Sequence, residues 1–261
     1  VGMHGVRLEV DTHIVLAATP ALKSLEQVLE RAELKPSHRT VSGLASAEAV
    51  LDRKQKESGA LVLDIGAGTT NLTVIEDGEV EHVAVIPMGG MHVTNDLAIG
   101  LKTELEIAEL VKIKHATLHS KTTGETSLVR EGQQYNFDRA LMRIIVAARY
   151  EELFEFVDKE LKKIHRSKKL PGGVVLVGGG SQLPGLVDFA KEELQLPVRL
   201  GKWESLPIVV DNIKGPRYAT AVGLMLLDML LGPAAVQDDV QPGFMQSMKG
   251  SFSGILKRIK K

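Results

Sequence analysis

A glycine turn between two apolar runs carries the residue types that bind a phosphate group. Segment 62–74 reads VLDIGAGTTNLTV, so an aspartate, two glycines and two threonines fall at the bend of an expected hairpin. Gly66 and Gly68 allow close backbone approach, the turn amides and threonine hydroxyls can donate to phosphate oxygens, and Asp64 can hold a hydrated Mg²⁺. The same pattern also suits an ordinary hairpin turn that an aspartate caps.

A second glycine cluster follows an apolar run later in the chain. Segment 174–186 reads VVLVGGGSQLPGL, which predicts a buried strand, a turn at Gly178–Gly180 and then a helix with Ser181 as its N-cap. A helix N-terminus behind three glycines is a ready anion or nucleotide site, although a tight turn that binds nothing has the same sequence. Neither cluster has the Rossmann spacing. Apolar residues at helical spacing support the helix, namely Leu186, Val187, Ala190 and Leu194.

The two clusters and the segment RYATAVGL at 217–224 together resemble the actin, Hsp70 and sugar-kinase superfamily of ATPases. In chain order they are similar to the second phosphate-binding hairpin, the adenosine motif and the hinge helix that follows it. The resemblance implies an α/β, actin-like (ribonuclease H-like) ATPase fold with two lobes around a nucleotide cleft, the first lobe being incomplete. It also implies ATP and Mg²⁺ as cofactors, with Asp64 holding the metal through water.

Further segments are similar to the FtsA family of bacterial cell division proteins, so that the resemblance covers essentially the whole chain. They are residues 1–10, 42–47, 85–90 and 108–114, and the amphipathic C-terminus. The resemblance implies an ATP-binding protein that anchors FtsZ polymers, the Z ring, to the cytoplasmic face of the cell membrane at the division site. Such a protein helps to recruit other division proteins, the divisome, and self-associates into filaments.

Three alternatives remain open at this point. A scaffold of type IV pilus assembly shares the fold and would bind a different peptide. An ATP-hydrolysing sugar kinase or chaperone belongs to the same superfamily. The third alternative is an α/β domain whose glycine turns bind nothing.

The family resemblance extends the nucleotide site to a polar pair on a helix. Glu109 and Lys112 stand in an A-E-x-x-K pattern, one helical turn apart, and in the family this position reaches the adenine and ribose. A simple i, i+3 surface pair is the alternative. The expected nucleotide-binding residues are Asp64, Gly66, Gly68, Thr69, Thr70, Asn71, Glu109, Lys112, Gly178, Gly179, Gly180 and Ser181.

No residue is assigned a catalytic role. In-line attack on a γ-phosphate needs a group that positions or deprotonates the water, and relatives in the superfamily supply an acid or a glutamine from the helix before the aspartate hairpin. Here that helix begins with Gly43 and Leu44, and the nearest acid, Glu48, lies further along. The sequence therefore favours ATP as a conformational or polymerisation switch, with weak hydrolysis at most.

The C-terminal segment combines large apolar residues with cations and contains no acid from position 244 on. The apolar side chains fall on one helical face, a pattern typical of an in-plane helix on anionic lipid. A helix docked on the protein's own core and a basic disordered tail are the alternatives. The expected membrane residues are Met248, Phe252, Ile255, Leu256 and Ile259, with the cations Lys249, Lys257, Arg258, Lys260 and Lys261.

Three arginines lie on one long expected helix. In the FtsA family this region belongs to the subdomain that captures the C-terminal peptide of FtsZ, and Arg149 matches a position implicated in that contact. Arg139, Arg143 and Arg149 are therefore the expected partner-binding residues, because cations suit a peptide that carries acidic groups. The alternative is a solvated helix face with Arg149 paired to Glu152 or Glu155.

Composition narrows the class of protein. The 261 residues are 44% hydrophobic and 25% charged, as in ordinary globular proteins, and a net charge of −1 argues against a nucleic-acid binder. There is no cysteine, the eight histidines lack metal-site spacing, and no apolar run approaches the roughly 20 residues that span a bilayer. Because the chain opens on Val1 inside an apparent strand, with no initiator methionine, we expect a fragment. The resemblance then implies that the first phosphate-binding hairpin is absent with the N-terminal part.

The resemblance divides the chain into six parts. Residues 1–36 are expected to be the remainder of an insertion subdomain (1C-like) and 37–58 the remainder of the first lobe (1A-like). The core of the second lobe (2A-like) takes 59–88 and 171–232, and a helical and β subdomain (2B-like) takes 89–170. Residues 233–243 are an expected linker, and 244–261 the membrane helix.

Periodicity and turn signals give the expected elements. We expect a strand over 6–17, one helix from residue 20 and another over 41–52. Three strands follow over 61–63, 72–75 and 80–86, with a hairpin turn at Asp77-Gly78 between the last two. A short hairpin is expected around 124–137 and a long helix over 137–166. The predicted inward face of the long helix is Leu141, Ile144, Ile145, Ala148, Leu153, Phe156 and Val157.

Overall fold

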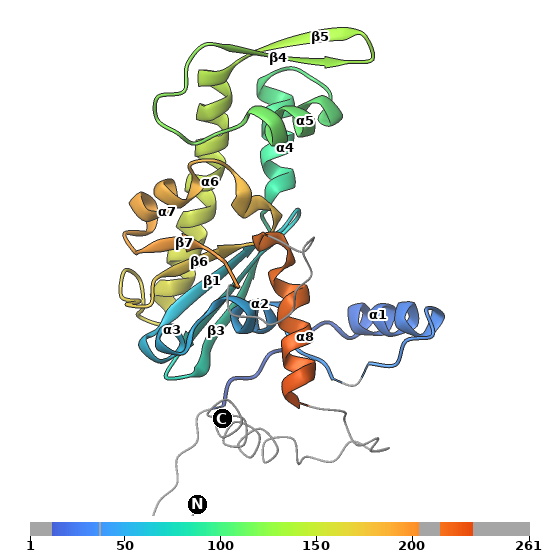
Figure 1. The fold of residues 1–261 in the computed structure, drawn as a ribbon, viewed down its shortest axis with the longest axis vertical. Helices are drawn as coiled ribbons and strands as arrows, with labels where there is room; N and C mark the ends of the chain where they lie inside the picture. Colours follow the sequence, from blue (N-terminus) through green and yellow to red (C-terminus); the bar gives the residue numbers. More distant parts are fainter. Residues whose placement is uncertain (1–11, 37, 204–214, 232–261) are drawn as a thin grey trace, which may run out of the picture.

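A five-stranded mixed sheet forms the centre of the molecule (Figure 1). The computed structural model describes residues 12–36, 38–203 and 215–231. The sheet has the order β3-β2-β1-β6-β7, in which β1 pairs antiparallel with β2 and parallel with β6. The strands are β1 (Ala60–Ile65), β2 (Thr70–Glu76), β3 (Glu79–Ile86), β6 (Val174–Val177) and β7 (Val198–Leu200).

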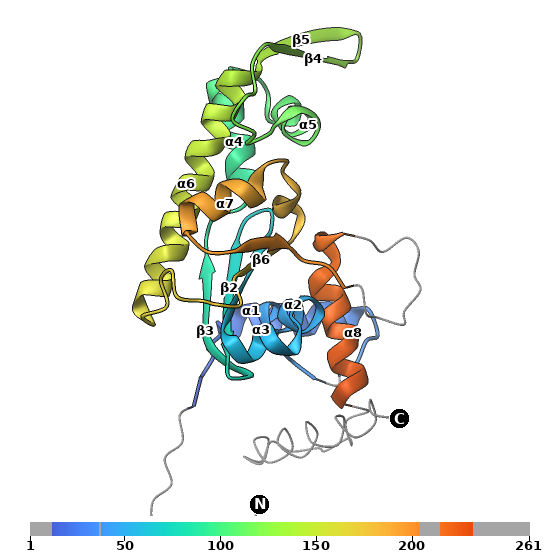
Figure 2. The ribbon, with the colours of Figure 1, turned by 60° about the vertical axis from the view of Figure 1, so that its left-hand side comes forward.

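Helices cover both faces of this sheet (Figure 2). The long α6 and the short α7 pack on one face, and α2, α3 and α8 lie on the other, so β1 is enclosed between two layers. The helices on these faces are α2 (Ser42–Val50), α3 (Arg53–Ser58), α6 (Arg139–Lys163), α7 (Leu186–Leu194) and α8 (Ala219–Leu231).

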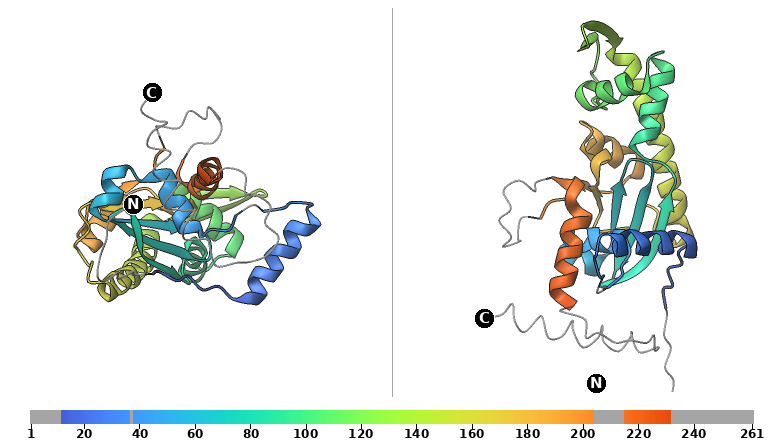
Figure 3. Two further views of the ribbon diagram at one scale, coloured as in Figure 1. Left: turned by 90° about the horizontal axis from the view of Figure 1, so that it is seen from below. Right: turned by 90° about the vertical axis from the view of Figure 1, so that its right-hand side faces the viewer.

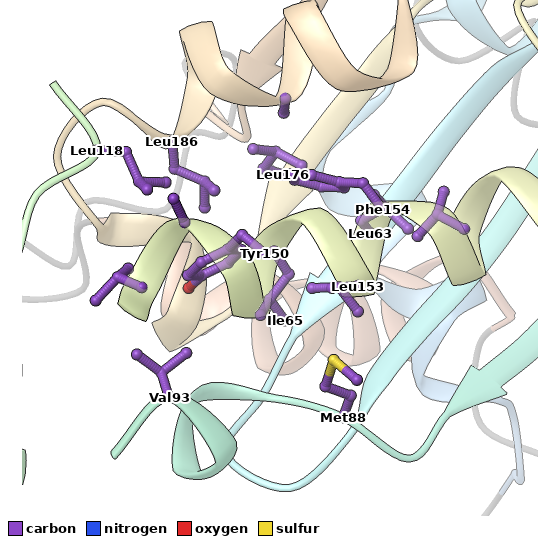
Figure 4. Close-up of a cluster of buried hydrophobic side chains, with 14 of the residues drawn as sticks. Leu63, Ile65, Met88, Val93, Leu118, Tyr150, Leu153, Phe154, Leu176 and Leu186 are labelled. Atoms are coloured by element: carbon purple, nitrogen blue, oxygen red, sulfur yellow. The ribbon is translucent and has the colours of Figure 1, made fainter. Parts of the chain in front are cut away.

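Strand β1 divides its side chains between the two layers because successive residues of a strand point to opposite faces. Leu61, Leu63 and Ile65 enter the larger apolar core under α6 and α7, whereas Ala60 and Val62 enter the smaller core under α2. Figure 4 shows Leu63 and Ile65 beside the aromatic rings of α6. The same alternation turns Asp64 toward the face that carries α2 and α8.

An extension stands on one end of α6, away from α3 and the far end of the sheet (Figures 1 and 3). It contains α4 (Gly90–Gly100), α5 (Leu105–His115) and a two-stranded sheet of β4 (Glu125–Arg130) and β5 (Gln133–Asp138). Helix α1 (Thr19–Arg31) has no buried residue.

Most expected elements are confirmed, with boundaries shifted by a few residues. The β2–β3 turn is the expected one, since Asp77 and Gly78 both adopt left-handed φ angles of 54° and 78°, as a two-residue hairpin loop requires. The expected strand over 6–17 is wrong for its described part, 12–17, which is irregular. Ile14 and Leu16 are exposed there and no described strand pairs with them, and an apolar run without a partner backbone does not make a strand.

The long helix is confirmed, but its predicted inward face is wrong in phase. Leu153 and Val157 are buried as expected, whereas Leu141, Ile144 and Phe156 are exposed. The first turns of α6 carry apolar residues on almost every side, so their spacing does not select a face. The sheet and α4 select it, and the buried set is Met142, Val146, Ala147, Tyr150, Leu153, Phe154, Val157 and Leu161.

None of the helices in the described ranges is long and apolar enough to cross a membrane. The expected linker over 233–243 and the membrane residues from Met248 to Lys261 lie outside the described residues.

We predict that two phenylalanines of α6, two positions apart, differ strongly in their effect on stability. Phe154 is 2% exposed in the core, and Phe156 is 38% exposed. Phe154→Ala should lower the free energy of unfolding by about 3–5 kcal/mol through cavity formation, and Phe156→Ala by about 1 kcal/mol or less. Urea unfolding of both variants measures this, and equal losses would contradict the observed phase of α6.

Candidate functional site

The two glycine turns found in the sequence meet at the end of β1. Parallel pairing sets Asp64 opposite Val177, so the turn that follows each strand emerges at the same sheet edge. A methyl group on Gly178 would lie 2.4 Å from Asp64 Oδ1, and one on Gly180 would lie 2.5 Å from Ile65 Cγ2. The second turn therefore rests directly on the residues that lead into the first.

At two positions of these turns, Gly68 and Gly179, neither a close contact nor the backbone conformation requires glycine. A methyl group on Gly68 or on Gly179 would meet nothing within 4 Å, and neither residue adopts a left-handed φ. Gly66 differs, because its N–H donates to Thr69 O at 2.9 Å and closes the first turn. At Gly68 and Gly179 the backbone is open to a close approach from outside, which suits a ligand held by main-chain amides.

The hydroxyl residues of the turns have distinct environments. Thr69 is exposed and Asn71 is partly buried, whereas Thr70 is fully buried and donates to Met88 O at 2.8 Å. Ser181 is also buried and donates to Gly178 O at 2.8 Å. These last two hydroxyls already have acceptors within the protein and hold the shape of the turns.

Ser181 is not the N-cap of the following helix, contrary to the sequence-based expectation. A 3₁₀ turn over Gly179–Gln182 intervenes, and α7 begins later, behind Gly185 with its left-handed φ of 83°. The hydroxyl of Tyr150 on α6 donates to Gly180 O at 2.9 Å and fixes this turn to the core (Figure 4 shows the Tyr150 ring). Burial raises the pKa of Tyr150, so its donating proton stays in place.

Gly89 and Gly90, at the start of α4, support the first glycine turn through backbone contacts. Gly90 N donates to Gly66 O at 2.9 Å and Met91 N donates to Ala67 O at 2.7 Å. A methyl group on Gly89 would lie 2.6 Å from Gly66 O, so only glycine allows the first turn of α4 this close. Sequence analysis identified this segment only as one that is similar to the family, and it predicted no contact between Gly89 or Gly90 and the first turn.

The Glu109–Lys112 pair joins α5 to the start of α4 at Gly90. Lys112 Nζ donates to Glu109 Oε2 and Thr94 Oγ1, each at 2.7 Å, and to Gly90 O at 2.9 Å. Thr94 also donates to Glu109. The pair is an i, i+3 ion pair, as one reading of the sequence had it, but Lys112 is only 17% exposed and the pair anchors the start of α4.

Two opposing effects act on the pKa of Glu109. Burial raises it, and the hydrogen bonds from Lys112 and Thr94 lower it, with the net result below the usual range. Glu109 is therefore ionised at neutral pH.

Asp64 is held by hydroxyls from two helices. Thr220 Oγ1 on α8 donates to Asp64 Oδ2 at 2.9 Å, and Ser46 Oγ on α2 lies 2.8 Å from Thr220 Oγ1 and 3.5 Å from Asp64 Oδ2. Sequence analysis missed Ser46 and Thr220. Both residues lie in segments that carry the family resemblance, 42–47 and 217–224, but that resemblance predicted no contact of either hydroxyl with Asp64.

The donor set around Asp64 bears on which metal could bind. Within the described ranges, no group of three or more His, Asp or Glu side chains is arranged to hold an ion. A lone carboxylate beside open backbone amides does not suit zinc, which takes three or four protein ligands. It fits Mg²⁺, which keeps several waters and binds through one or two carboxylates together with phosphate oxygens.

The three arginines of α6 fall into two classes. Arg149 is paired with Asp96 on α4 at 2.5 and 2.8 Å and with Glu152 at 2.6 Å, and the hydrogen bond to Asp96 is the main reason that its pKa is raised. The Nε atoms of Arg139 and Arg143 are buried and have no hydrogen-bond partner among the described residues.

A hollow of about 490 Å³ opens in the same extension, between the end of α4 and β5. Polar and apolar side chains share its wall. They are Ala98, Ile99, Lys102, Thr103, Glu104, Gln133 and Tyr135.

The sequence matches one family model, described as cell division protein FtsA, over residues 61–223. The cell division protein FtsA of Pseudomonas aeruginosa is 36% identical over 230 residues, which cover 86% of this chain and 55% of that protein. The FtsA of Neisseria meningitidis is 35% identical over 267 residues, covering 100% of this chain and 64% of the relative. The chain thus spans between half and two thirds of the length of these relatives.

Solved structures give the fold. The crystal structure of MreB 5 of Spiroplasma citri bound to AMPPNP superposes with a TM-score of 0.66 at 16% identity, over 82% of this chain and 65% of that one. The fold is therefore actin-like, as the glycine motifs had indicated.

We predict that Lys112→Met raises the pKa of the Glu109 carboxyl, because burial then acts without the ammonium group that opposes it. A group whose folded pKa is depressed stabilises the fold above its unfolded pKa and loses that contribution as the pH falls through the folded pKa. In the variant this stabilising contribution shrinks, because only the hydrogen bond from Thr94 still opposes the effect of burial. Side-chain carbon NMR titration measures both pKa values, and an unchanged pKa would contradict the pairing.

Proposed function

The chain belongs to the FtsA family of cell division proteins, and on this premise we propose that it is part of an ATP-binding adaptor of the division site. The adaptor would anchor FtsZ polymers to the cytoplasmic face of the cell membrane, self-associate in filaments and help to recruit other division proteins. We put forward neither the pilus scaffold nor the kinase or chaperone, because the matched family and relatives are division proteins.

One observation carries the nucleotide-binding part of this proposal, namely the open backbone at Gly68 and Gly179 on either side of Asp64. We assign the phosphates of ATP to the amides of the first turn together with Thr69. The adenosine is assigned to the turn at Gly178–Gly180. The neighbour of like fold, MreB 5, was crystallised with AMPPNP.

Asp64 would hold Mg²⁺ through water in this arrangement, and the ion would screen the charge of the phosphate oxygens. Thr70 and Ser181 support the two turns through their buried hydroxyls. Asn71 stands directly opposite Asp64 in the β1–β2 register, beside the carboxylate that we assign to the metal.

The pair on α5 would form the sugar end of the site. The side chain of Glu109 is 44% exposed, and its described hydrogen bonds fall on Oε2, so we assign Oε1 to a ribose hydroxyl. Lys112 holds the carboxylate in place, and both stand beside Gly90, which bonds to the first glycine turn.

Slow turnover fits the surroundings of Asp64. The nearest groups on α2 and α8 are the hydroxyls of Ser46 and Thr220, neither of which is a base at neutral pH. Glu48, the nearest acid on α2, is paired with Lys56 at 2.6 Å, and both side chains are largely buried. Because none of these described groups can act as a base on a water, we propose that ATP acts as a conformational or polymerisation switch rather than as a rapidly hydrolysed substrate.

The extension would bind the C-terminal peptide of FtsZ. Arg139 and Arg143 each bring a guanidinium group to α6, and cations suit a peptide that carries acidic groups. Their Nε atoms are buried and have no hydrogen-bond partner among the described residues. The hollow beside Lys102 and Tyr135 offers room for an apolar side chain. Arg149 is engaged by Asp96, so we assign it to holding α4 against α6.

Membrane attachment would rest on residues 244–261, which lie outside the described residues. The segment contains Lys249, Lys257, Arg258, Lys260 and Lys261 with no acid. Each cation near an anionic surface contributes about 1 kcal/mol, and the apolar face adds buried area.

We predict that filling the open space beside the second turn blocks nucleotide binding without unfolding the protein. In the intact protein, Gly179→Val and Asp64→Ala should each weaken Mg-ATP binding at least about tenfold, equal to roughly 1.4 kcal/mol. Isothermal titration calorimetry measures affinity, and thermal unfolding checks the fold. Glu79→Val, exposed on β3, is the control and should bind as the parent does. Unaltered titrations of both site variants would refute the assignment.

A second prediction separates the two tethering surfaces in one assay. In co-sedimentation of the intact protein with FtsZ polymers and anionic vesicles, deletion of residues 244–261 should abolish vesicle pelleting and leave FtsZ pelleting intact. Arg139→Glu combined with Arg143→Glu should do the reverse, because the reversed charges repel an acidic peptide. If the deletion variant still pelleted with vesicles, the anchor would lie elsewhere in the protein.

A further inference from the structure

The carboxylate of Asp64 has two sides with different neighbours. Oδ1 lies against the second glycine turn, where a methyl group on Gly178 would be 2.4 Å away. Oδ2 accepts the hydrogen bond from Thr220. One carboxylate therefore contacts the turn assigned to the adenosine with one oxygen and helix α8 with the other.

The hydroxyl protons order these contacts into a chain. A hydroxyl donates one hydrogen bond and accepts up to two. Thr220 donates to Asp64, so the 2.8 Å contact between Ser46 and Thr220 has Ser46 as its donor. Donor chains that end on a charged acceptor are stronger than isolated hydroxyl pairs. The chain runs from α2 through α8 to β1.

The two helices cross with their backbones in contact at this point. A methyl group on Gly223 of α8 would lie 1.7 Å from Ala45 O, and one on Gly43 would lie 1.9 Å from Thr73 Oγ1 of the sheet. Close-packed backbones have no side chains to absorb a small displacement, so they shift between discrete arrangements. Helix α2 is thus fixed on the sheet, and α8 is fixed on α2.

The fully buried residues of α8 all lie in its first turns. They are Ala219, Val222 and Gly223, whereas Leu224, Met225 and Met229 further along are exposed. Thr220 makes its hydrogen bond to Asp64 within the same first turns.

We infer that Thr220, with Ser46 behind it, couples occupancy of the nucleotide site to the position of α8. This rests on the proposed assignment of Asp64 to the hydrated metal. A ligand that engages Oδ1 stops rotation of the carboxylate, so Oδ2 stays aligned on Thr220 and the first turns of α8 become more rigid. Thr220 is a positioning residue in this scheme and does not touch the nucleotide.

The test is hydrogen exchange of the α8 amides with and without Mg-ATP, in the intact protein. In the parent, Mg-ATP should slow exchange in α8 at least about fivefold, the effect of roughly 1 kcal/mol of added hydrogen-bond stability. In Thr220→Val, which keeps the shape of the side chain, ligand-free α8 should exchange faster and its response to Mg-ATP should disappear, although calorimetry still detects binding. Ser46→Ala should reduce the response partly.

Thr126→Val is the matched control. It makes the same change of side chain on β4 of the extension, where it removes the 3.0 Å contact between Thr126 Oγ1 and His115 Nδ1. It should respond to Mg-ATP as the parent does. If Thr220→Val bound Mg-ATP and kept the full α8 response, the coupling alone would be overturned. If the parent itself titrated no Mg-ATP, the proposed function would fail, and the coupling with it.

Discussion

The parallel pairing of β1 with β6 is the contact on which the rest of the structure depends. Four aligned residue pairs, from Leu61 with Val174 to Asp64 with Val177, join segments separated by the whole helical extension. Parallel strands end at the same edge of a sheet. The pairing therefore converts two unrelated turns into neighbours and sets Asp64 beside Gly178. Without this pairing the two turns would lie apart and could not form one site.

The burial of β1 on both faces makes that pairing rigid. Leu61, Leu63 and Ile65 belong to one core, and Val62 to the other. A shift of the strand register would therefore move buried side chains out of both cores. Asp64 is the one charged residue in this strand, and its cost of partial burial is offset by hydroxyl donors rather than by a cation.

Glycine serves two different purposes around this edge of the sheet. Gly89, Gly178 and Gly223 are required by contacts inside the protein, since a methyl group at any of them would overlap neighbouring backbone or side-chain atoms. Gly68 and Gly179 are required by no such contact. The distinction separates glycines that internal contacts require from glycines that they do not, and it follows only from tertiary contacts.

The sequence by itself determined the strands and hairpins of the core and the long helix, because these follow from local periodicity and turn chemistry, whereas the actin-like fold was implied by the resemblance of the glycine motifs to a known superfamily. Tertiary structure alone decided which side of α6 is buried, since its first turns are apolar on nearly every side. It also decided that Ser181 closes a turn instead of capping a helix, and that Ser46 and Thr220 meet Asp64. The last of these depends on contacts between residues more than 100 positions apart, whereas sequence patterns report only what neighbours along the chain favour.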